Sequence, residues 1–368
     1  MGHLESLVEV LSDYSRCAVL ERDDSRIVVL ERGARILGAF LGGSPNLLWV
    51  NPKLEEELRE GGWNVGGLRL WISPERNFFY RRPEEFEDWF CPQGLDPGSY
   101  RIVEASSDRA VLEGEIAAFD HLAKDELKGL VRREIRLLEG GAGRLRLRIR
   151  ERILGEYRSR VNPWVLAQVP TGYAGVGTVL APARRGAEPI PYFGEIPRNR
   201  LRVSANHVSF RIDGNFVAKL GIKPEDLREP GLGSIGYVYR IGRRLWSALI
   251  LRTSNIPLAQ EDCLDVPRHD PSLPRAALQS YNSGPEAFED IKFGEIELQL
   301  TPTENFSGRI FASVEYDFIA MVGSRGEVLK GIRRILGIAK PRLYYASALP
   351  APPRIRFMSG SSFSISRP

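Results

Sequence analysis

The sequence is poor in the residues on which several common protein classes depend. Its 368 residues include only 3 cysteines and 4 histidines. Cys17, Cys91 and Cys263 lie far apart and form no Cys-x-x-Cys pair or Cys/His cluster, which argues against a structural zinc site. Few, scattered cysteines are typical of a reducing compartment, so we expect a cytoplasmic protein. No motif predicts a metal or a cofactor.

Long apolar runs are also missing. No stretch approaches the roughly 20 apolar residues that a membrane-spanning helix requires. The first fourteen residues carry Glu5, Glu9 and Asp13 within an apolar pattern. A signal peptide needs a basic start and an uninterrupted apolar run, so we expect neither secretion nor a membrane partner.

The net charge is small, at +4, which does not indicate nucleic-acid binding, because dedicated binders usually concentrate basic residues on one face. The basic residues are unevenly divided, since only 8 of the 51 are lysine. Arginine makes planar, bidentate contacts with carboxylates that lysine cannot make. A general compositional habit explains this excess, but an arginine-rich platform for an acidic partner stays open as an alternative.

Strand patterns dominate the remainder of the chain, in which 43% of residues are hydrophobic. Helices are expected near the N-terminus and at 83–90 and 326–336. Many short, punctuated strands without regular helices between them indicate an all-β fold, a large antiparallel sandwich or barrel. We predict one domain over 1–345 and a Pro/Ser-rich tail over 346–368. The expected strands are 26–31, 33–40, 101–103, 109–118, 129–138, 143–154, 200–212, 234–241, 245–253, 276–283, 294–301 and 309–321.

One predicted strand, 143–154, shows a strict alternation of residue type. Leu145, Leu147 and Ile149 share one face with Glu151, and four arginines occupy the other face. A period of two with one charged face is typical of an antiparallel strand that is wet on one side. The turn at Gly140-Gly141 predicts a hairpin with the strand before it.

The segment 61–75 combines glycines with residues that sugar sites favour. An aromatic face stacks on the C–H face of a pyranose, while arginine and carboxylates hold hydroxyl groups. The alternative is that the tryptophans belong to the core and the glutamate is a solvated turn residue. With the segment just before it, this region supplies Trp49, Trp63, Arg69, Trp71 and Glu75.

A second informative region runs from 278 to 302. In its later strand, Glu295, Glu297 and Gln299 share one face, since side chains alternate along a strand. Such a face suits an acid–base residue, although a strand facing water has the same pattern. Gln279 and Tyr281 precede it in the neighbouring predicted strand.

These segments resemble the galactose mutarotase-like (aldose 1-epimerase) superfamily. Its members carry Q-x-Y-T followed by G-x-x-E-x-Q, and here Gln279-Ser280-Tyr281-Asn282 precedes Gly294-Glu295-Ile296-Glu297-Leu298-Gln299. The segment 61–75 is also similar to a GG-x-x-x-W-x-x-PE pattern in uncharacterised mutarotase-like families. The resemblance implies an antiparallel supersandwich with a sugar-sized groove, in which Glu297 corresponds to the catalytic base. The expected substrate-binding residues are Arg69, Trp71, Glu75, Trp164, Gln168, Gln279, Tyr281 and Gln299.

The sequence departs from the family at the histidines. A mutarotase uses two, one of them in an N-H-x-x-F segment that corresponds to 161–168 here, where Trp164 or Gln168 stands instead. Glutamine cannot act as an acid near neutral pH. Asn206-His207 begins an N-H-x-x-F match about forty residues too late, which we interpret as coincidence. The complementary acid stays open among Lys219, Glu261, Asp262 and Asp265.

Three hypotheses follow for function. The first is a carbohydrate-binding protein that acts as an aldose epimerase, or on sugars in another way, with Glu297 as acid/base. The second is a sugar sensor or lectin-like module without catalysis, which the missing histidine favours. The third is the arginine-rich platform. The expected partner is a small-molecule carbohydrate, with no nucleic acid.

Overall fold

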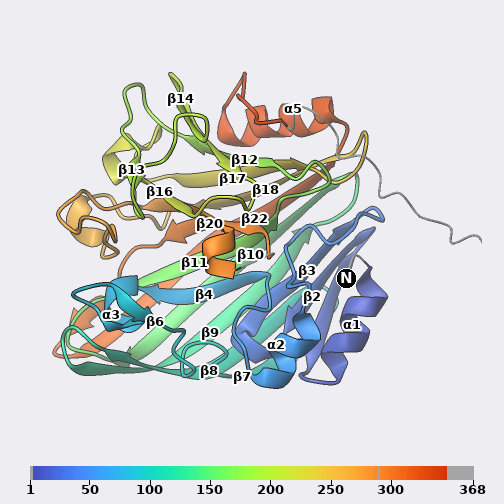
Figure 1. The fold of residues 1–368 in the computed structure, drawn as a ribbon. Coiled ribbons are helices and arrows are strands. Elements are labelled where there is room, and N and C mark those ends of the chain that lie inside the picture. The colour runs from blue at the N-terminus through green and yellow to red at the C-terminus, as the bar shows by residue number, and fades with distance from the viewer. Residues whose placement is uncertain (1–2, 289–290, 346–368) are drawn as a thin grey trace, which may run out of the picture.

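The computed structural model describes residues 3–288 and 291–345 (Figure 1). The predicted tail, 346–368, lies outside these residues, and the predicted domain boundary at 345 stays a prediction. The described chain forms two large antiparallel sheets with few short helices, which confirms the predicted all-β class. Among the described residues, no helix combines the length and apolar character needed to cross a membrane.

One of the two large sheets has nine strands, in the order β1-β2-β3-β4-β11-β20-β19-β16-β13. The strands β1 to β4 are neighbours in chain order, but β4, β11 and β20 come from distant parts of the sequence, so this part of the order cannot be read from the chain. The sheet brings β4 beside β11 and β11 beside β20. Its strands are β1 (Cys17–Arg22), β2 (Ser25–Leu30), β3 (Arg35–Leu41), β4 (Leu68–Ser73), β11 (Asn162–Pro170), β13 (Ile190–Pro191), β16 (Ala218–Ile222), β19 (Leu278–Asn282) and β20 (Phe293–Gln299).

The larger sheet has eleven strands, ordered β14-β15-β12-β17-β18-β22-β10-β9-β8-β7 with β21 paired to β22. A separate two-stranded sheet pairs β5 with β6. The bounds in the larger sheet are β7 (Ser99–Ala105), β8 (Arg109–Asp120), β9 (Asp125–Glu139), β10 (Arg144–Glu156), β12 (Gly177–Pro182), β14 (Leu201–Val203), β15 (His207–Ile212), β17 (Gly233–Arg240), β18 (Trp246–Thr253), β21 (Glu304–Phe306) and β22 (Arg309–Gly323); the small sheet has β5 (Tyr80–Arg82) and β6 (Glu87–Trp89).

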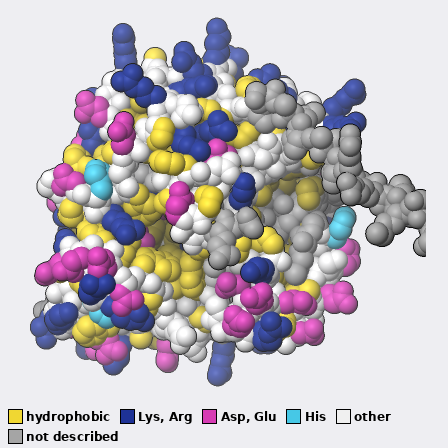
Figure 2. Space-filling model, viewed as in Figure 1, with side chains coloured by type: hydrophobic (Ala, Val, Ile, Leu, Met, Phe, Trp, Pro, Cys, Tyr) yellow, Lys and Arg dark blue, Asp and Glu magenta, His cyan; other side chains and the backbone are white. Residues whose placement is uncertain are grey.

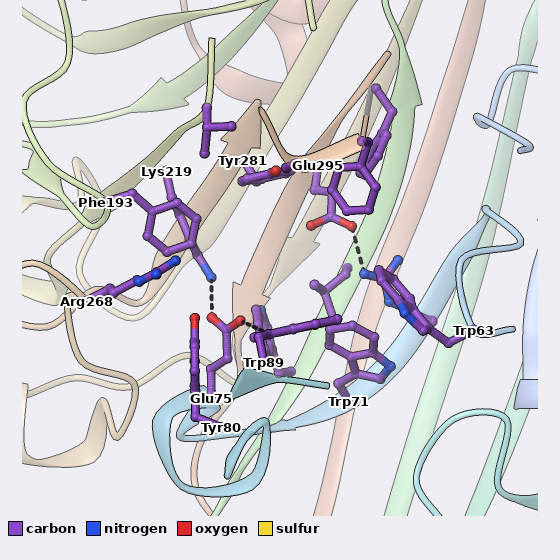
Figure 3. A pocket seen from close by; sticks show the side chains of 17 residues that line it. Trp63, Trp71, Glu75, Tyr80, Trp89, Phe193, Lys219, Arg268, Tyr281 and Glu295 are labelled. Carbon is purple, nitrogen blue, oxygen red and sulfur yellow. Dashed lines mark hydrogen bonds and ion pairs between the residues drawn. The ribbon is translucent and has the colours of Figure 1, made fainter. Parts of the chain in front are cut away.

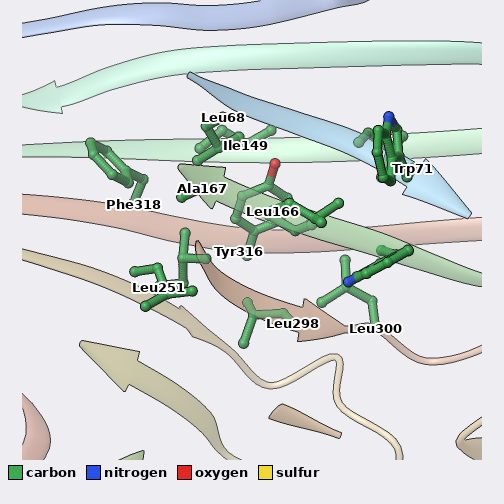
Figure 4. Close-up of a cluster of buried hydrophobic side chains, with 14 of the residues drawn as sticks. Leu68, Trp71, Ile149, Leu166, Ala167, Leu251, Leu298, Leu300, Tyr316 and Phe318 are labelled. Atoms are coloured by element: carbon green, nitrogen blue, oxygen red, sulfur yellow. The ribbon is translucent and has the colours of Figure 1, made fainter. Parts of the chain in front are cut away.

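The main hydrophobic core contains side chains from both large sheets (Figure 4). Ile149 and Phe318 enter it from the eleven-stranded sheet, and Leu68 and Leu298 enter it from the nine-stranded sheet. Because side chains alternate along a strand, the face of β20 opposite Leu298 is free to carry polar groups outward. This outward face of the nine-stranded sheet is where the candidate functional site lies.

Short helices cover the outer faces of the sheets. The helices α1 (Leu4–Ser12) and α2 (Leu54–Glu60) pack on β2 and β3 through a separate apolar cluster. The helix α5 (Arg325–Leu336) packs on β17, β18 and β22 of the larger sheet (Figure 1). The predicted helices near the N-terminus and at 326–336 are therefore confirmed, whereas α2 and several strands, including β4, β11 and β16, were not predicted.

Two predicted elements are wrong. The segment 83–90 is not helical but forms a turn and β6, because Phe86 and Asp88 adopt positive φ values of 55° and 57°, which a right-handed helix excludes. The single strand expected at 200–212 is divided into β14 and β15, which pair with each other across a turn at 204–206.

The charged face of β10 is confirmed as a wet sheet face. Arg146 and Arg148 pair with Asp317 of β22, and Arg150 pairs with Glu315. On the opposite face, Glu151 is fully buried. Part of the arginine excess thus forms ion pairs between neighbouring strands. The carboxylates of β22 compensate the positive charges on this face.

Candidate functional site

A pocket of about 370 Å³ lies on the outward face of the nine-stranded sheet. The space-filling view shows hydrophobic side chains around a hollow in this face (Figure 2). Its floor comes from β4, β11, β16, β19 and β20, while α3 (Glu75–Phe78), β5, β6, α4 (Pro285–Phe288) and loops supply the rim. The lining residues are Trp63, Arg69, Trp71, Glu75, Tyr80, Trp89, Trp164, Leu166, Phe193, Val217, Lys219, Arg268, Tyr281, Ala287, Phe288, Phe293 and Glu295.

Lys219 on β16 is the centre of a buried charge cluster. Its Nζ lies 3.4 Å from Glu297 Oε2, 3.5 Å from Glu75 Oε2 and 3.9 Å from Asp265 Oδ2. The ammonium group also lies 4.4 Å from the centre of the Trp164 ring. Figure 3 shows Lys219 pointing toward Glu75 at the pocket surface. One ammonium therefore faces three carboxyl groups that come from distant parts of the chain.

The cluster changes the proton affinity of its members. Burial raises the pKa of Glu297 to about 7, although the positive charge of Lys219 acts in the opposite direction. Burial also raises the pKa of Asp265, again against the effect of Lys219. Burial by itself lowers the pKa of Lys219, but Glu297, Glu75 and Asp265 together raise it well above its ordinary value. Lys219 is thus held charged, while Glu297 exchanges protons near neutral pH.

Each carboxylate of the cluster has further hydrogen-bond donors. The indole Nε1 of Trp164 donates to Glu297 Oε2 at 3.0 Å, and that of Trp89 donates to Glu75 Oε1 at 3.0 Å. Gln279 Nε2 donates to Asp265 Oδ2 at 2.9 Å, and the backbone N–H of Glu75 donates to Asp265 Oδ1 at 3.0 Å. These donors fix the orientation of the carboxylates around Lys219.

A second ion pair lines the same pocket. Arg69 Nη2 lies 2.7 Å from Glu295 Oε1, and the guanidinium carbon lies 4.1 Å from the centre of the Trp71 ring. Arg69 is buried, and its Nε and Nη1 atoms have no hydrogen-bond partner in the described part of the chain. Buried donors without partners are rare in proteins, so Arg69 retains unused hydrogen-bonding capacity beside the pocket.

Trp71 is held in place from behind. Its Nε1 donates to Asp96 Oδ2 at 2.7 Å, and Asp96 also forms a buried ion pair with Arg35 of β3. The rings of Trp63 and Trp71 lie 5.4 Å apart, and those of Trp71 and Trp164 lie 5.7 Å apart. With Trp89, these tryptophans form one side of the pocket, which we call the tryptophan wall: Trp63, Trp71, Trp89 and Trp164.

The structure gathers part of the predicted residue set at the pocket. The predicted residues that line it are Arg69, Trp71, Glu75, Trp164 and Tyr281. Gln279 and Glu297 lie below the lining, within the Lys219 cluster. Gln168 and Gln299 do not line the pocket, because Gln168 donates to Asn64 at 2.9 Å and Gln299 accepts from Ser73 at 2.6 Å.

Several lining residues were not identified from the sequence. Tyr80, Trp89, Phe193, Arg268 and Phe288 have no motif, and only the aromatic density around 78–90 gave a signal for the first two. None of the four histidines, all of which lie in the described residues, lines the pocket. His207 lies on β15 of the larger sheet, where its Nε2 accepts from the backbone of Arg342 at 3.4 Å.

The segment considered for the complementary acid is divided by the fold. Lys219 and Asp265 join the cluster with Glu297. Asp262 instead pairs with Arg160 at 2.9 Å, and the backbone oxygen of Glu261 accepts from the same arginine. Of the four residues considered, the structure brings two to Glu297.

Comparisons with known proteins identify one family model and several solved structures that are similar to this chain. Residues 2–153 match a family of unknown function, DUF6786. No curated protein matches the chain. The chain is similar in structure to a candidate aldose 1-epimerase from Escherichia coli K12, with a TM-score of 0.50, 12% identity, and coverage of 84% of this chain and 99% of that one. This likeness shows that the two chains share a fold, which is the fold that the sequence resemblance implied.

Two other structures show similar coverage at lower scores. A galactose 1-epimerase from Lactobacillus acidophilus has a TM-score of 0.41 and 14% identity, over 83% of this chain and 93% of its own. A candidate aldose 1-epimerase from Klebsiella pneumoniae has a TM-score of 0.46 and 10% identity, over 90% and 91%.

Proposed function

We propose that the protein binds a carbohydrate in this pocket and interconverts its anomers. The observation that carries the proposal is the juxtaposition of aromatic faces with the Glu75–Lys219 pair, behind which lies Glu297 with a pKa of about 7. Aromatic rings stack on sugar C–H faces, and carboxylate and ammonium groups hold hydroxyls. A group that titrates near the working pH is suited to proton transfer.

In the proposed reaction, Glu75 takes the proton of the anomeric hydroxyl. The C1–O5 bond of the ring then breaks as the C1 carbonyl forms, and O5 receives a proton from Lys219. Protonated Glu297, 3.4 Å from Nζ, passes its proton to Lys219 in the same step, so that Lys219 stays charged. Rotation about the C1–C2 bond and the reverse proton transfers close the ring with the other anomeric configuration. Glu297 thus serves as acid/base through Lys219, while Arg69 and Glu295 hold other hydroxyls.

A sugar sensor without catalysis is the second candidate function. Two observations favour it: Glu297 is fully buried beneath the lining, and no histidine lines the pocket in the described residues. In this case the ion pairs serve recognition only. The arginine platform gains no support from β10, because its arginines already pair with carboxylates.

NMR measurement of anomer interconversion in a panel of aldoses tests the proposal. We expect the wild type to accelerate the reaction for at least one sugar. Glu75→Gln and Glu297→Gln should each lower the catalysed rate by at least about 100-fold, the usual contribution of general acid–base catalysis. The matched control is Glu113→Gln, because Glu113 is an exposed residue of β8 that pairs with Arg132. This variant should retain the wild-type rate.

Saturable sugar binding without acceleration would support the sensor instead. If no aldose in the panel binds, and none is interconverted, both carbohydrate proposals are wrong.

A further inference from the structure

The pocket has a second aromatic side that differs in chemistry from the tryptophan wall. Ring centres lie 6.0 Å apart between Phe193 and Tyr281, 5.9 Å between Tyr281 and Phe293, and 5.1 Å between Phe288 and Phe293. Val217 packs in the same apolar cluster. We call this side the phenylalanine wall: Phe193, Val217, Tyr281, Phe288 and Phe293.

Hydrogen-bonding groups are distributed unequally between the two walls. The phenylalanine wall has the Tyr281 hydroxyl as its single polar side-chain group. The other polar lining groups include two ion pairs, Lys219–Glu75 and Arg69–Glu295, and the guanidinium of Arg268, which lies 6.0 Å from the centre of the Phe193 ring. Figure 3 shows Lys219 pointing toward Glu75, with Phe193 beside Lys219 and Arg268, and Tyr281 near Glu295. A ligand in this pocket therefore meets polar groups on one part and mainly carbon on another.

A simple sugar does not match this division. Hydroxyl groups project around most of a pyranose ring, and each one that is buried without a partner costs free energy. Hydroxyls placed against Val217, Phe288 and Phe293 would find no side-chain partner on those residues. The Phe193 end of the wall, in contrast, lies near the cationic groups of Lys219 and Arg268. An apolar group on the same surface would instead gain from leaving water.

The pocket also has room for more than one ring. Its volume of about 370 Å³ falls in the range of roughly 300–1,000 Å³ that is usual for sites of drug-sized ligands. The pocket thus has space beyond a single sugar ring, and the polarity of the lining side chains determines which chemical group binds in that space.

We infer that the ligand is a carbohydrate bearing an apolar substituent, with the sugar at the ion pairs and the substituent against the phenylalanine wall. This inference rests on the proposed carbohydrate binding and specifies the substrate class. The anomeric hydroxyl stays free for ring opening, so the substituent is carried at another ring position, as an ether or ester of a hydroxyl group.

Matched sugar ethers test the inference. The probes are the O4 and O6 benzyl ethers of glucose, galactose and mannose, each compared with the methyl ether at the same position. Binding is measured by the fluorescence of the pocket tryptophans. For at least one sugar, we expect the benzyl ether to bind at least about tenfold more tightly, because an additional aromatic ring leaves water.

Variants of the phenylalanine wall locate the effect. Phe288→Ala should remove most of the benzyl preference, measured as the ratio of benzyl-ether to methyl-ether affinity within the same variant. Phe288→Leu keeps an apolar side chain and should retain part of the preference, which separates loss of contact from loss of folding. Phe311→Ala is the control, since Phe311 is exposed on β22, outside the pocket lining, and should change neither affinity.

The outcomes separate this inference from the proposed function. Equal affinity for benzyl and methyl ethers would overturn the apolar substituent and leave carbohydrate binding intact. A benzyl preference that Phe288→Ala does not reduce would also overturn it. Binding of benzyl alcohol as tightly as the benzyl ethers, with no binding of methyl ethers, would contradict both proposals, because the sugar would then contribute nothing.

Discussion

Glu297 is the residue whose environment changes its chemistry most clearly. It is fully buried, receives a hydrogen bond from Trp164 and lies next to Lys219. Burial raises its pKa to about 7 from an ordinary value of 4.5. Because the folded pKa lies above the unfolded one, the folded state binds more protons between these values. The contribution of Glu297 to stability is complete below pH 4.5 and is lost as the pH rises through 7.

Glu297→Gln should remove this pH dependence, since glutamine does not titrate. The free energy of unfolding of the wild type, relative to the variant, should fall by up to about 3 kcal/mol between pH 4.5 and pH 8. Urea unfolding at a series of pH values measures this difference. In the Glu113→Gln control the difference from wild type should stay nearly flat, and a flat profile for Glu297→Gln would contradict the raised pKa.

At the scale of the element, the two faces of β10 contribute differently to stability. Leu145, Leu147 and Ile149 are fully buried between the sheets. On the outer face, Arg150 is 44% exposed and pairs with Glu315 of the neighbouring strand at 3.0 Å. Exposed ion pairs contribute little to stability, whereas buried methyl and methylene groups contribute much.

Alanine substitutions on β10 should therefore have unequal effects. Ile149→Ala should lower the free energy of unfolding by about 2–5 kcal/mol, through lost burial and an internal cavity. Arg150→Ala should lower it by less than about 1 kcal/mol, and less still at high salt. Urea unfolding of both variants provides the measurement. Equal losses would mean that the arginine face is a structural necessity and not a wet surface.

At the scale of the whole molecule, the two large sheets depend on one core. Strands of both sheets contribute to the same buried cluster, which includes Leu68, Leu298, Ile149 and Phe318. Neither sheet can lose its partner without exposing this surface to water. The pocket on the outer face thus rests on a support that both sheets provide.

The shared core predicts a single cooperative unfolding transition. Tryptophan fluorescence reports mainly on the pocket side, and far-UV circular dichroism reports on both sheets. The midpoints of the two curves in urea should coincide, as expected for two-state unfolding. Trp246→Phe removes the tryptophan of β18 in the larger sheet, and its fluorescence midpoint should match the dichroism midpoint as well. Two separated transitions would contradict the prediction of one domain.

Local patterns in the sequence determined the fold class and much of the strand content. Alternation in 143–154 and 294–301 identified β10 and β20 and assigned Glu297 to the face that carries Glu295, because side-chain direction depends only on the neighbouring backbone. The motifs around Gln279 and Glu297 gave the resemblance, and the structure then confirmed the fold that it implied. The helix expected at 83–90 failed because positive φ values at two residues override the local composition.

Only the tertiary structure decided the composition of the site. Glu75, Lys219, Asp265 and Glu297 are separated by long stretches of chain. Strand order brings Glu297 of β20 near Lys219 of β16, and the packing of α3 and of the loop that holds Asp265 adds the other two carboxyl groups. The raised pKa of Glu297 likewise depends on burial, which no short segment specifies. Periodicity fixes the face on which a residue lies, but strand order and packing fix its neighbours, and the chemistry of this pocket depends on those neighbours.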